Sequence, residues 1–516
     1  MAISEEALRQ IVQSVVANVE KELGGGELQK EPSTPTAKAL APVKMKTVTQ
    51  VPENTAVVGA QGSDGVFADM RSAVEQAAEA QALFVKEISV SERTRILEAI
   101  KKIVTEKKRF LAEQVVEETK LGSVEDKVKK HELVVMKTPG VEDLRTEAVS
   151  GDDGLTITEY APFGVIGSVT PVTNPTTTII NNSLSMLAAG NSVVFNVHPS
   201  SKRTCQVLIR YLNKAIIEAG GPANLITMVA EPSMETLEIL ARHPKVRLLV
   251  GTGGPGLVRS LLQSGKKAIG AGAGNPPVIV DETADLANAA KSIILGASFD
   301  HNILCIAEKE VFVMEEAADE LIYHFLEEGA YMLGKDDLER VMSLVLKEDK
   351  RDPGAAAGCT LNPAKKYHVS KEWVGQSAEK ILRAIGIEKQ GVKLLICETD
   401  FDHPFVQLEQ MMPVLPLVKT STFEEAVEKA VFAERGNRHT AVIHSKNVDR
   451  MTAFARAIET TIFVKNASSL AGVGFGGEGH TTMSIAGPTG EGVTSARTFT
   501  RKRRCVLAEG GFRIIG

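Results

Sequence analysis

The first 23 residues carry an apolar stripe at helical spacing. In residues 3–23, Ile, Leu and Val recur every three or four positions, which predicts an amphipathic helix. Ser4 is placed to cap this helix, and Glu5 and Glu6 suit the positive end of its dipole. Residues 24–48 begin with a stretch rich in Gly, Pro and Thr, which is typical of a flexible linker. A short helix on a linker cannot bury its own stripe, so it either packs back on its own body or a sister subunit, or docks onto another protein.

The hydrophobic pattern changes twice further along the chain. Residues 67–120 keep the 3.6-residue period and predict helices. From about residue 160, short β-rich runs such as "GVIGSVT", "NSVVFNV" and "KVRLLVG" alternate with helical stretches. A second alternating block, with "PVIVDE", "EVFVM" and "TAVIHS" among its strands, spans about 278–466. Strand–helix alternation of this kind predicts an α/β protein with a parallel, doubly wound sheet.

Composition and charge exclude several function classes. The chain has 516 residues, 43% hydrophobic and 24% charged, which fits a globular protein of two or three domains. A net charge of −6 argues against nucleic-acid binding, and the basic run 501–504 is typical of a solvated face or an intersubunit contact. No apolar run approaches the roughly 20 residues of a membrane span, and no secretory signal is visible. We therefore expect a cytoplasmic protein with no membrane or nucleic-acid partner.

The five cysteines are scattered and odd in number. They are Cys205, Cys305, Cys359, Cys397 and Cys505, and no CxxC motif occurs. This spacing argues against a disulfide framework or a zinc site, so we expect no metal and a reducing compartment.

Cys305 stands out from the other cysteines by its surroundings. It lies in "SFDHNILCIAEKEV" (298–311), between a predicted helix and a predicted strand, with small and polar residues just before the thiol. A lone cysteine is more often an inert core residue, but a core strand would be apolar here. A nucleophilic thiol needs partial exposure and a stabilised thiolate. Asn302 or nearby backbone N–H groups are candidates for that stabilisation.

Three other segments offer groups that can bind or polarise a ligand. Gly251-x-Gly253-x-x-Gly256 joins a strand to a helix, as in phosphate-binding turns, but the acidic residue expected about 20 positions later is missing. The segment 270–290 begins with a bare loop of small residues and has no side chain there for acid–base chemistry. In 170–183, Asn174 is either an ordinary turn residue or a neutral donor to an oxyanion.

Together these segments resemble the aldehyde dehydrogenase superfamily, and within it the CoA-acylating enzymes of bacterial microcompartments, of the propanediol- and ethanolamine-utilisation type. The resemblance spans essentially the whole chain and rests on "APFGVIGSVTPVTNPT", "GTGGPG", "GAGAGNPPVIVDETADL", "ASFDHNILCIAEK" and "EQMMPVLPLVK", among others. It implies the aldehyde dehydrogenase fold, with a Rossmann-like cofactor-binding domain, an α/β catalytic domain and a β-arm for oligomerisation. The implied boundaries are 49–145 and 163–275 for the cofactor-binding domain, 276–484 for the catalytic domain, and 146–162 and 485–516 for oligomerisation elements.

The resemblance also implies a mechanism centred on Cys305. Its thiolate attacks a short-chain aldehyde, a hydride passes to NAD, and coenzyme A removes the acyl group from the resulting thioester. Hydrolytic relatives carry a glutamate that activates water, and Ala271 occupies that column here. Without a positioned base, attack by water loses a factor of about 10²–10⁴, whereas a thiol nucleophile needs less help. The sequence therefore favours release of acyl-CoA.

The same resemblance assigns cofactor-binding and oxyanion residues. The expected cofactor contacts are Thr170, Pro171, Val172, Asn196, His198, Gly251, Thr252, Gly253 and Glu409, the last holding the nicotinamide ribose. Asn196 and Pro199 replace the usual lysine and glutamate at the adenosine ribose, so NADP is also possible. The oxyanion donor is Thr173 or Asn174, depending on where a gap is placed, together with the backbone N–H of Cys305.

The N-terminal helix resembles the encapsulation peptides of microcompartment enzymes. This implies that residues 1–23 dock onto shell or lumen proteins, which places the enzyme inside a bacterial microcompartment. We expect a homo-oligomer, dimer or tetramer, in which "TITEY" (156–160) alternates like an exposed strand that pairs with a neighbour. The alternatives are a hydrolytic NAD(P)-dependent aldehyde dehydrogenase and a catalytically silent lumen scaffold. The sequence does not decide between acetaldehyde and propionaldehyde.

Overall fold

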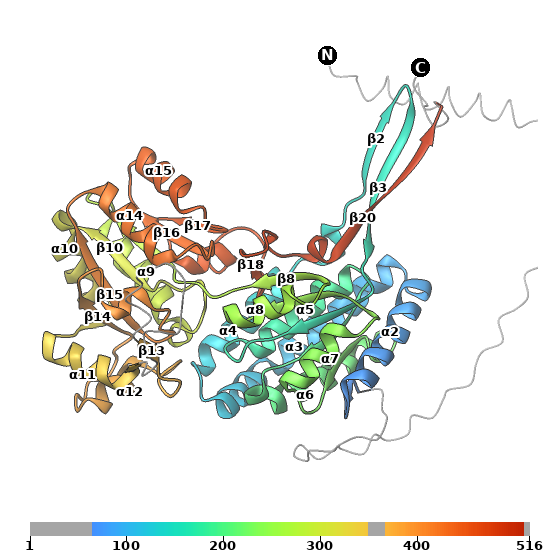
Figure 1. Ribbon diagram of the computed structural model, residues 1–516, viewed down its shortest axis with the longest axis horizontal. Coiled ribbons are helices and arrows are strands. Elements are labelled where there is room, and N and C mark those ends of the chain that lie inside the picture. Colours follow the sequence, from blue (N-terminus) through green and yellow to red (C-terminus); the bar gives the residue numbers. More distant parts are fainter. Residues whose placement is uncertain (1–63, 349–366, 510–516) are drawn as a thin grey trace, which may run out of the picture. The chain divides into compact units, whose positions relative to one another are not determined.

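A six-stranded parallel sheet forms the first half of the molecule. The computed structural model describes residues 64–348 and 367–509 (Figure 1), so the predicted N-terminal helix, the linker and Cys359 lie outside the described residues. The strand order is β1-β6-β5-β4-β7-β8, and every pairing is parallel. The strands are β1 (Val66–Phe67), β4 (Val165–Val169), β5 (Ser192–Asn196), β6 (Ile226–Val229), β7 (Val246–Thr252) and β8 (Lys267–Ala271).

Helices bury both faces of this first sheet. One core joins the sheet to α3 (Val90–Thr119), α5 (Pro175–Ala188) and α6 (Lys202–Glu218), and the other joins it to α2 (Met70–Glu87), α7 (Met234–Arg242) and α8 (Pro255–Leu262). Successive strand residues alternate between the cores: Val193 and Phe195 enter the first, and Val194 enters the second. Burial on both sides explains why these strands are continuous apolar runs in the sequence. The predicted doubly wound architecture is therefore confirmed.

The second sheet has seven parallel strands in the order β11-β14-β15-β10-β9-β16-β17. They are β9 (Pro277–Val280), β10 (Glu310–Met314), β11 (Ala330–Met332), β14 (Leu394–Glu398), β15 (Val414–Thr420), β16 (Thr440–His444) and β17 (Ile462–Lys465). The helices α9 (Leu286–Ser298) and α10 (Glu315–Glu327) share one core with it, and α14 (Phe423–Glu434) and α15 (Val448–Ile458) share another.

A smaller cluster lies beside β14 and β15. It contains α11 (Lys335–Val345), α12 (Ala378–Ala384), the antiparallel pair β12 (Leu346–Glu348) and β13 (Tyr367–Val369), and the one-turn helix α13 (Pro404–Gln407). None of the helices in the described part of the chain is both long enough and apolar enough to cross a membrane.

Helix α4 (Val124–Lys137) buries an unusual set of polar side chains. Ser123 caps its N-terminus, where its hydroxyl accepts from the backbone N–H of Asp126. Lys127, Lys130 and His131 are each no more than 2% exposed. Buried lysines need partners that offset the loss of water, so this helix must lie against acceptors supplied by other segments.

A three-stranded antiparallel ribbon extends beyond the other described elements in Figure 1. It consists of β2 (Glu147–Gly151), β3 (Gly154–Pro162) and β20 (Thr500–Ala508), with β3 in the middle. The expectation that "TITEY" pairs with a neighbouring subunit is wrong, because β2 and β20 of the same chain occupy both edges of β3. The free edges of the ribbon belong to β2 and β20. The basic run 501–504 is exposed on β20.

The segment before β20 returns to the first core. It includes the pair β18 (Ile485–Ala486) and β19 (Gly492–Val493), and the side chains of Ala486, Ala496 and Phe499 join the α3–α5–α6 side of the sheet. Within the predicted oligomerisation segment 485–516, the described residues that join the ribbon are therefore 500–508.

Candidate active site

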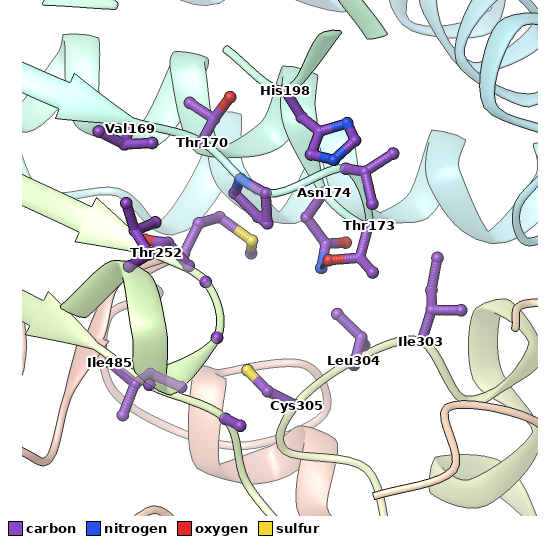
Figure 2. A pocket seen from close by; sticks show the side chains of 18 of the residues that line it. Val169, Thr170, Thr173, Asn174, His198, Thr252, Ile303, Leu304, Cys305 and Ile485 are labelled. Carbon is purple, nitrogen blue, oxygen red and sulfur yellow. Dashed lines mark hydrogen bonds between the residues drawn. The ribbon is translucent and has the colours of Figure 1, made fainter. Parts of the chain in front are cut away.

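A cavity of about 500 Å³ lies where the strand order of the first sheet reverses, beyond the carboxyl ends of β4 and β7. In doubly wound sheets this is where ligands bind. The turn before β10 supplies the opposite side of the cavity, and Figure 2 shows Thr173 and Asn174 facing Ile303, Leu304 and Cys305. The lining residues include Thr170, Pro171, Val172, Thr173, Asn174, Asn196, His198, Thr252, Gly253, Cys305 and Glu409. Motifs that are far apart in the sequence thus meet around one cavity.

Gly251 and Ala271 do not line the cavity. Gly251 lies within β7, where a Cβ atom would lie 2.2 Å from Leu261 Cδ1, so the glycine allows α8 to pack closely on the strand. Ala271 ends β8 and is 2% exposed. The next residues of the same loop, Gly272 and Ala273, do line the cavity. Residues 270–274 therefore present no ionisable side chain to it.

The backbone before Cys305 makes a left-handed turn. Asp300, His301 and Asn302 have φ values of 48°, 55° and 63°, a region that L-residues other than glycine rarely occupy in succession. The Asn302 amide donates to the carbonyls of Ala297 (2.8 Å) and Glu308 (3.0 Å). The suggestion that Asn302 stabilises the thiolate is wrong, because this amide is committed to holding the turn.

Cys305 is half-buried and lines the cavity. Cys205 is fully buried in the core shared with α3, α5 and α6, and Cys397 is fully buried in the smaller cluster beside β14 and β15. Burial raises the pKa of the Cys305 thiol to about 12, and the carboxylate of Glu409 adds to the rise. The Lys309 ammonium and the backbone N–H groups of Cys305 and Ile306 act in the opposite direction. The thiol is therefore protonated at neutral pH, and the groups that favour its thiolate are already in place around it.

Lys309 is a buried cation behind the Cys305 turn. It is 1% exposed, and its Nζ donates to the carbonyl oxygens of Asn302 (3.1 Å) and Leu304 (3.0 Å) and to the side-chain oxygen of Asn302. Burial lowers its pKa, while Glu409 and Cys305 act to raise it. Sequence reasoning missed Lys309, because an "EKE" at a strand start resembles an ordinary charged edge.

Glu409 lines the cavity from the loop that follows α13. Burial raises the pKa of its carboxyl group, and the Lys309 ammonium and the backbone N–H of Gly274 counter that rise. Glu409 is the one acidic residue among the lining residues of the described chain. Its carboxylate is thus the single acidic group in a largely apolar cavity.

Asn174 is the N-cap residue of α5, but its side chain makes no capping hydrogen bond. Its Oδ1 accepts from Lys130 Nζ at 2.5 Å, and its Nδ2 lies 3.3 Å from Thr173 Oγ1. Because an ammonium group only donates, this contact fixes the carboxamide oxygen on the Lys130 side and leaves the N–H₂ as the donor end. Thr173 and Asn174 both reach the cavity, and of the two only Asn174 carries an amide donor.

Lys130 belongs to a buried ionic cluster with Lys127 and Asp300. The Asp300 carboxylate accepts from Lys127 Nζ (3.0 Å), from Lys130 Nζ and from the backbone N–H of Ser123 (2.7 Å). Burial alone would raise the pKa of Asp300, but the two ammonium groups hold it below its ordinary value. Burial also lowers the pKa of Lys127 to about 8. The only sequence signal for this cluster is the spacing of Lys127 and Lys130 on one helical face.

The end of the cavity lined by Asn196 and His198 contains no carboxylate among the described lining residues. Asn196 accepts from Thr236 Oγ1 at 2.7 Å, and His198 Nδ1 accepts from the backbone N–H of Ser200 at 3.2 Å. Partial burial, and then Lys371, lower the pKa of His198. Asn196 and His198 therefore bring no negative charge to this end of the cavity, and a 2′-phosphate there would meet no repulsion from them.

The residues at the switch point fit a dinucleotide. The Thr170 hydroxyl is buried and has no hydrogen-bond partner in the structure, although the residue lines the cavity. A Cβ atom at Gly254 would meet nothing within 4 Å, so the backbone is open to a ligand there. An unpartnered donor and a bare turn before α8 are the features that a pyrophosphate requires.

His439 is another buried residue beside the site to which the sequence analysis assigned no role. It is 1% exposed, its Nδ1 contacts Thr440 Oγ1 at 2.9 Å, and its Nε2 has no partner in the structure. A Cβ atom at Gly274 would lie 2.6 Å from the Cys305 carbonyl oxygen and 3.0 Å from His439 Cγ, so the ring packs beside the cysteine turn. Burial and Lys309 lower its pKa to about 4, which keeps the imidazole neutral.

The family model for the aldehyde dehydrogenase family matches residues 41–501. The chain therefore belongs to the aldehyde dehydrogenase family, and the predicted fold is confirmed. Acetaldehyde dehydrogenase (acetylating) EutE from Salmonella typhimurium is 48% identical over 454 residues, 87% of this chain and 94% of the relative. Propanal dehydrogenase (CoA-propanoylating) from the same organism is 46% identical over 448 residues, 86% of this chain and 92% of the relative.

Solved structures of aldehyde dehydrogenases are also similar to this chain. The propionaldehyde dehydrogenase from the Clostridium phytofermentans fucose utilisation bacterial microcompartment has a TM-score of 0.81 and 48% identity, covering 86% of this chain and 98% of that one. The Rhodopseudomonas palustris propionaldehyde dehydrogenase with bound CoA and an acylated cysteine has a TM-score of 0.81 and 46% identity. The match covers 86% of this chain and 98% of that one. The predicted resemblance to CoA-acylating microcompartment enzymes is confirmed by these relatives.

Proposed function

We propose that the protein is a CoA-acylating aldehyde dehydrogenase. It oxidises a short-chain aldehyde, acetaldehyde or propionaldehyde, with NAD⁺ and CoA to acyl-CoA and NADH, through a thioester on Cys305. The observation that carries this proposal is a single cavity lined by Cys305, Asn174 and Glu409 and by a facing loop without a carboxylate. Relatives with acetylating and CoA-propanoylating activity support it.

The reaction begins when the Cys305 thiol gives its proton to water and the resulting thiolate attacks the aldehyde carbonyl carbon, whose C=O π electrons pass to the oxygen. Lys309 and the backbone N–H groups of Cys305 and Ile306 favour the thiolate. The oxyanion of the thiohemiacetal is stabilised by Asn174 Nδ2 and the backbone N–H of Cys305. Preorganised donors in a water-poor cavity need no reorganisation as charge develops on that oxygen.

The cofactor would be held by residues at the ends of β4 and β7 and by Glu409. Thr170 would offer its unpartnered hydroxyl, Gly254 its open backbone, and the Glu409 carboxylate would accept from the ribose hydroxyl groups. When bound, the nicotinamide supplies the hydride acceptor. Neutral groups at Asn196 and His198 support the use of NADP as well as NAD.

The acyl group then leaves by thiolysis. The CoA thiolate attacks the thioester carbon, the same two donors stabilise the second tetrahedral oxyanion, and the Cys305 thiolate is released. Water is a poor competitor, because residues 270–274 provide no base to activate it, which costs about 10²–10⁴ in rate. The intact set of Cys305, Asn174 and Glu409 argues against a silent scaffold.

The domain roles and partners extend this proposal. Cofactor binding is assigned to residues 49–145 and 163–275, and catalysis to 276–484. Homo-oligomer formation, as a dimer or tetramer, is assigned to the ribbon, whose free strands β2 and β20 carry the exposed apolar residues Val149 (71%) and Val506 (59%). Residues 1–23 direct the enzyme to shell or lumen proteins of a bacterial microcompartment, in keeping with the named source of a related structure.

The deciding experiment is an NADH assay with C2–C4 aldehydes, with and without CoA, and with NAD⁺ or NADP⁺. We expect NADH formation that depends on both aldehyde and CoA, with acyl-CoA as product. Acetaldehyde and propionaldehyde differ by one methylene, worth about 1–3 kcal/mol in a pocket, so both react and one is preferred. Free acid formed without CoA would favour the hydrolytic alternative, and inactivity with every pair would favour the scaffold.

Encapsulation has a separate test. Deletion of residues 1–45 is expected to leave soluble activity intact and to abolish co-purification with shell proteins. Loss of folding on this deletion would instead support packing of the helix on its own subunit.

A further inference from the structure

Lys130 connects the buried ionic cluster to the cavity. It lines the cavity from α4, and its side chain is 3% exposed. Its Nζ donates both to Asn174 Oδ1, at 2.5 Å, and to the Asp300 carboxylate. One ammonium group therefore joins the start of α5 to the turn that carries Cys305.

This contact determines which end of the Asn174 carboxamide faces the substrate. Asn174 is the N-cap residue of α5, but its side chain makes no capping hydrogen bond, so the helix does not fix its amide. The other polar contact of the amide in the structure is from Nδ2 to the Thr173 hydroxyl, which can donate or accept and so does not select an orientation. An ammonium group accepts nothing, so the Lys130 contact excludes the flipped amide.

We propose that Lys130 is a positioning residue for the chemistry at Cys305. It holds the Asn174 carboxamide with its N–H₂ toward the carbonyl oxygen of the aldehyde and of the thioester. Its positive charge behind the amide oxygen also polarises the amide and makes its N–H groups stronger donors to an oxyanion. The inference rests on the proposed roles of Cys305 and Asn174.

Lys127 provides a matched control within the same helix. It lies one turn before Lys130, its side chain is equally buried at 3%, and its Nζ contacts the same Asp300 carboxylate at 3.0 Å. It makes no hydrogen bond to Asn174 among the described contacts. Removing either lysine leaves Asp300 with one ammonium partner, so the two substitutions perturb the ionic cluster alike. Only the substitution of Lys130 also removes a hydrogen bond to the Asn174 carboxamide.

The first experiment compares Lys130→Met with Lys127→Met in the full-length enzyme. Loss of an oxyanion donor costs about 10²–10³ in kcat, and a donor that is present but misoriented is expected to cost less. We expect Lys130→Met to lower kcat for CoA-dependent NADH formation by about 10- to 100-fold, with aldehyde KM changed less than about threefold. Lys127→Met is expected to keep kcat within about threefold, and both variants to show similar falls in Tm. Equal losses of kcat in the two variants would overturn the inference.

A double-mutant cycle with Asn174→Ala separates positioning from a general structural effect. If Lys130 acts through Asn174, adding Lys130→Met to Asn174→Ala lowers kcat by no more than about a further threefold. Losses that multiply would overturn the inference. If Lys130→Met does not give folded protein, the same cycle is made with Lys130→Gln, for which a multiplicative loss is equally decisive. Lys130→Arg, which keeps a cationic donor, is expected to recover part of the rate.

The wild-type enzyme, assayed in parallel, distinguishes failure of the proposed function from failure of the inference about Lys130. A wild-type protein that forms no acyl-CoA would overturn the proposed function and this inference with it. An active wild-type protein whose Lys130 and Lys127 variants behave alike would overturn the inference alone.

Discussion

The two walls of the cavity each have a buried lysine behind a proposed reactive group, but the two ammonium groups have different partners. Behind Asn174, Lys130 contacts the carboxylate of Asp300, which offsets part of its charge. Behind Cys305, Lys309 donates to carbonyl and amide oxygens of Asn302 and Leu304, which are neutral. Neutral acceptors satisfy the N–H groups without cancelling the charge. Lys130, which contacts a carboxylate directly, therefore serves to position its neighbours. Lys309 has only neutral hydrogen-bond partners, so its charge also acts on Cys305 and on the carboxylate of Glu409.

The largest expected difference in kcat between the two walls is between loss of the nucleophile, Cys305, and loss of the oxyanion donor, Asn174. Cys305→Ala is expected to lower kcat by at least about 10⁴, because no thioester forms. Asn174→Ala is expected to lower it by about 10²–10³, the effect of losing one oxyanion donor. Both are measured as CoA-dependent NADH formation. The control is Cys205→Ala in the first core, which should keep the rate and cost about 1–2 kcal/mol of stability. Full activity in Cys305→Ala would refute the mechanism.

Lys309→Met tests whether the unpaired cation acts on the thiol. The ammonium lowers the pKa of Cys305, so its removal raises that pKa and reduces the thiolate fraction about tenfold for each unit. We expect kcat to fall by about 10- to 100-fold, and alkylation of Cys305 by iodoacetamide to require higher pH. Lys127→Met should not move the pH profile of alkylation. Identical profiles for Lys309→Met and wild type would show that the two walls do not differ in this way.

Glu409→Gln is expected to shift the same profile in the opposite direction. The Glu409 carboxylate raises the pKa of Cys305, so a neutral amide lowers it and alkylation begins at lower pH. Loss of a charged acceptor for the ribose is expected to raise the KM for NAD⁺ by about tenfold. Glu398→Gln, at the exposed end of β14, serves as the control. A shift to higher pH would contradict the sign of this interaction.

The smallest predicted effect concerns the loop between the walls. Ala273 faces the cavity, whereas Ala271 is 2% exposed at the end of β8. Ala273→Glu is expected to divert a few per cent of the acyl groups to free acid, because a carboxylate near the thioester can activate water. Ala271→Glu is expected to lower Tm instead, since it buries a charge in the sheet. The ratio of acid to acyl-CoA, measured by chromatography, tests both; acid from the Ala271 variant alone would reverse the assignment.

Much of the fold was predictable because its strands are buried on both faces. Apolar runs such as "GVIGSVT" and "PVIVDE" correspond to β4 and β9. The residues of the candidate active site were predicted from the sequence less completely than the fold. Segments at strand ends, including Asn174 and Cys305, were predicted from motifs, and both line the cavity.

The groups behind the site were not predictable from local patterns. Lys130 and Asn174 are 44 residues apart, and Lys130 and Asp300 are 170 apart, so no spacing rule connects them. The choice between Thr173 and Asn174 depended on a gap in the sequence comparison, whereas the Lys130 contact gives a physical argument for Asn174. The role suggested for Asn302 failed for a related reason, because its amide partners depend on the left-handed turn.

That turn also has a consequence for how the protein matures. Each L-residue in the left-handed region costs about 1–2 kcal/mol, so Asp300, His301 and Asn302 keep this shape only when outside contacts hold them. Those contacts include the backbone N–H of Ser123, 177 residues before Asp300, and the carbonyl of Gly375, 74 residues after His301. The turn is therefore expected to form late in folding, once both flanking parts of the chain have docked. In a newly made or partly folded chain, the Cys305 thiol is therefore not yet positioned for catalysis. Enzyme activity then indicates that the chain has folded completely.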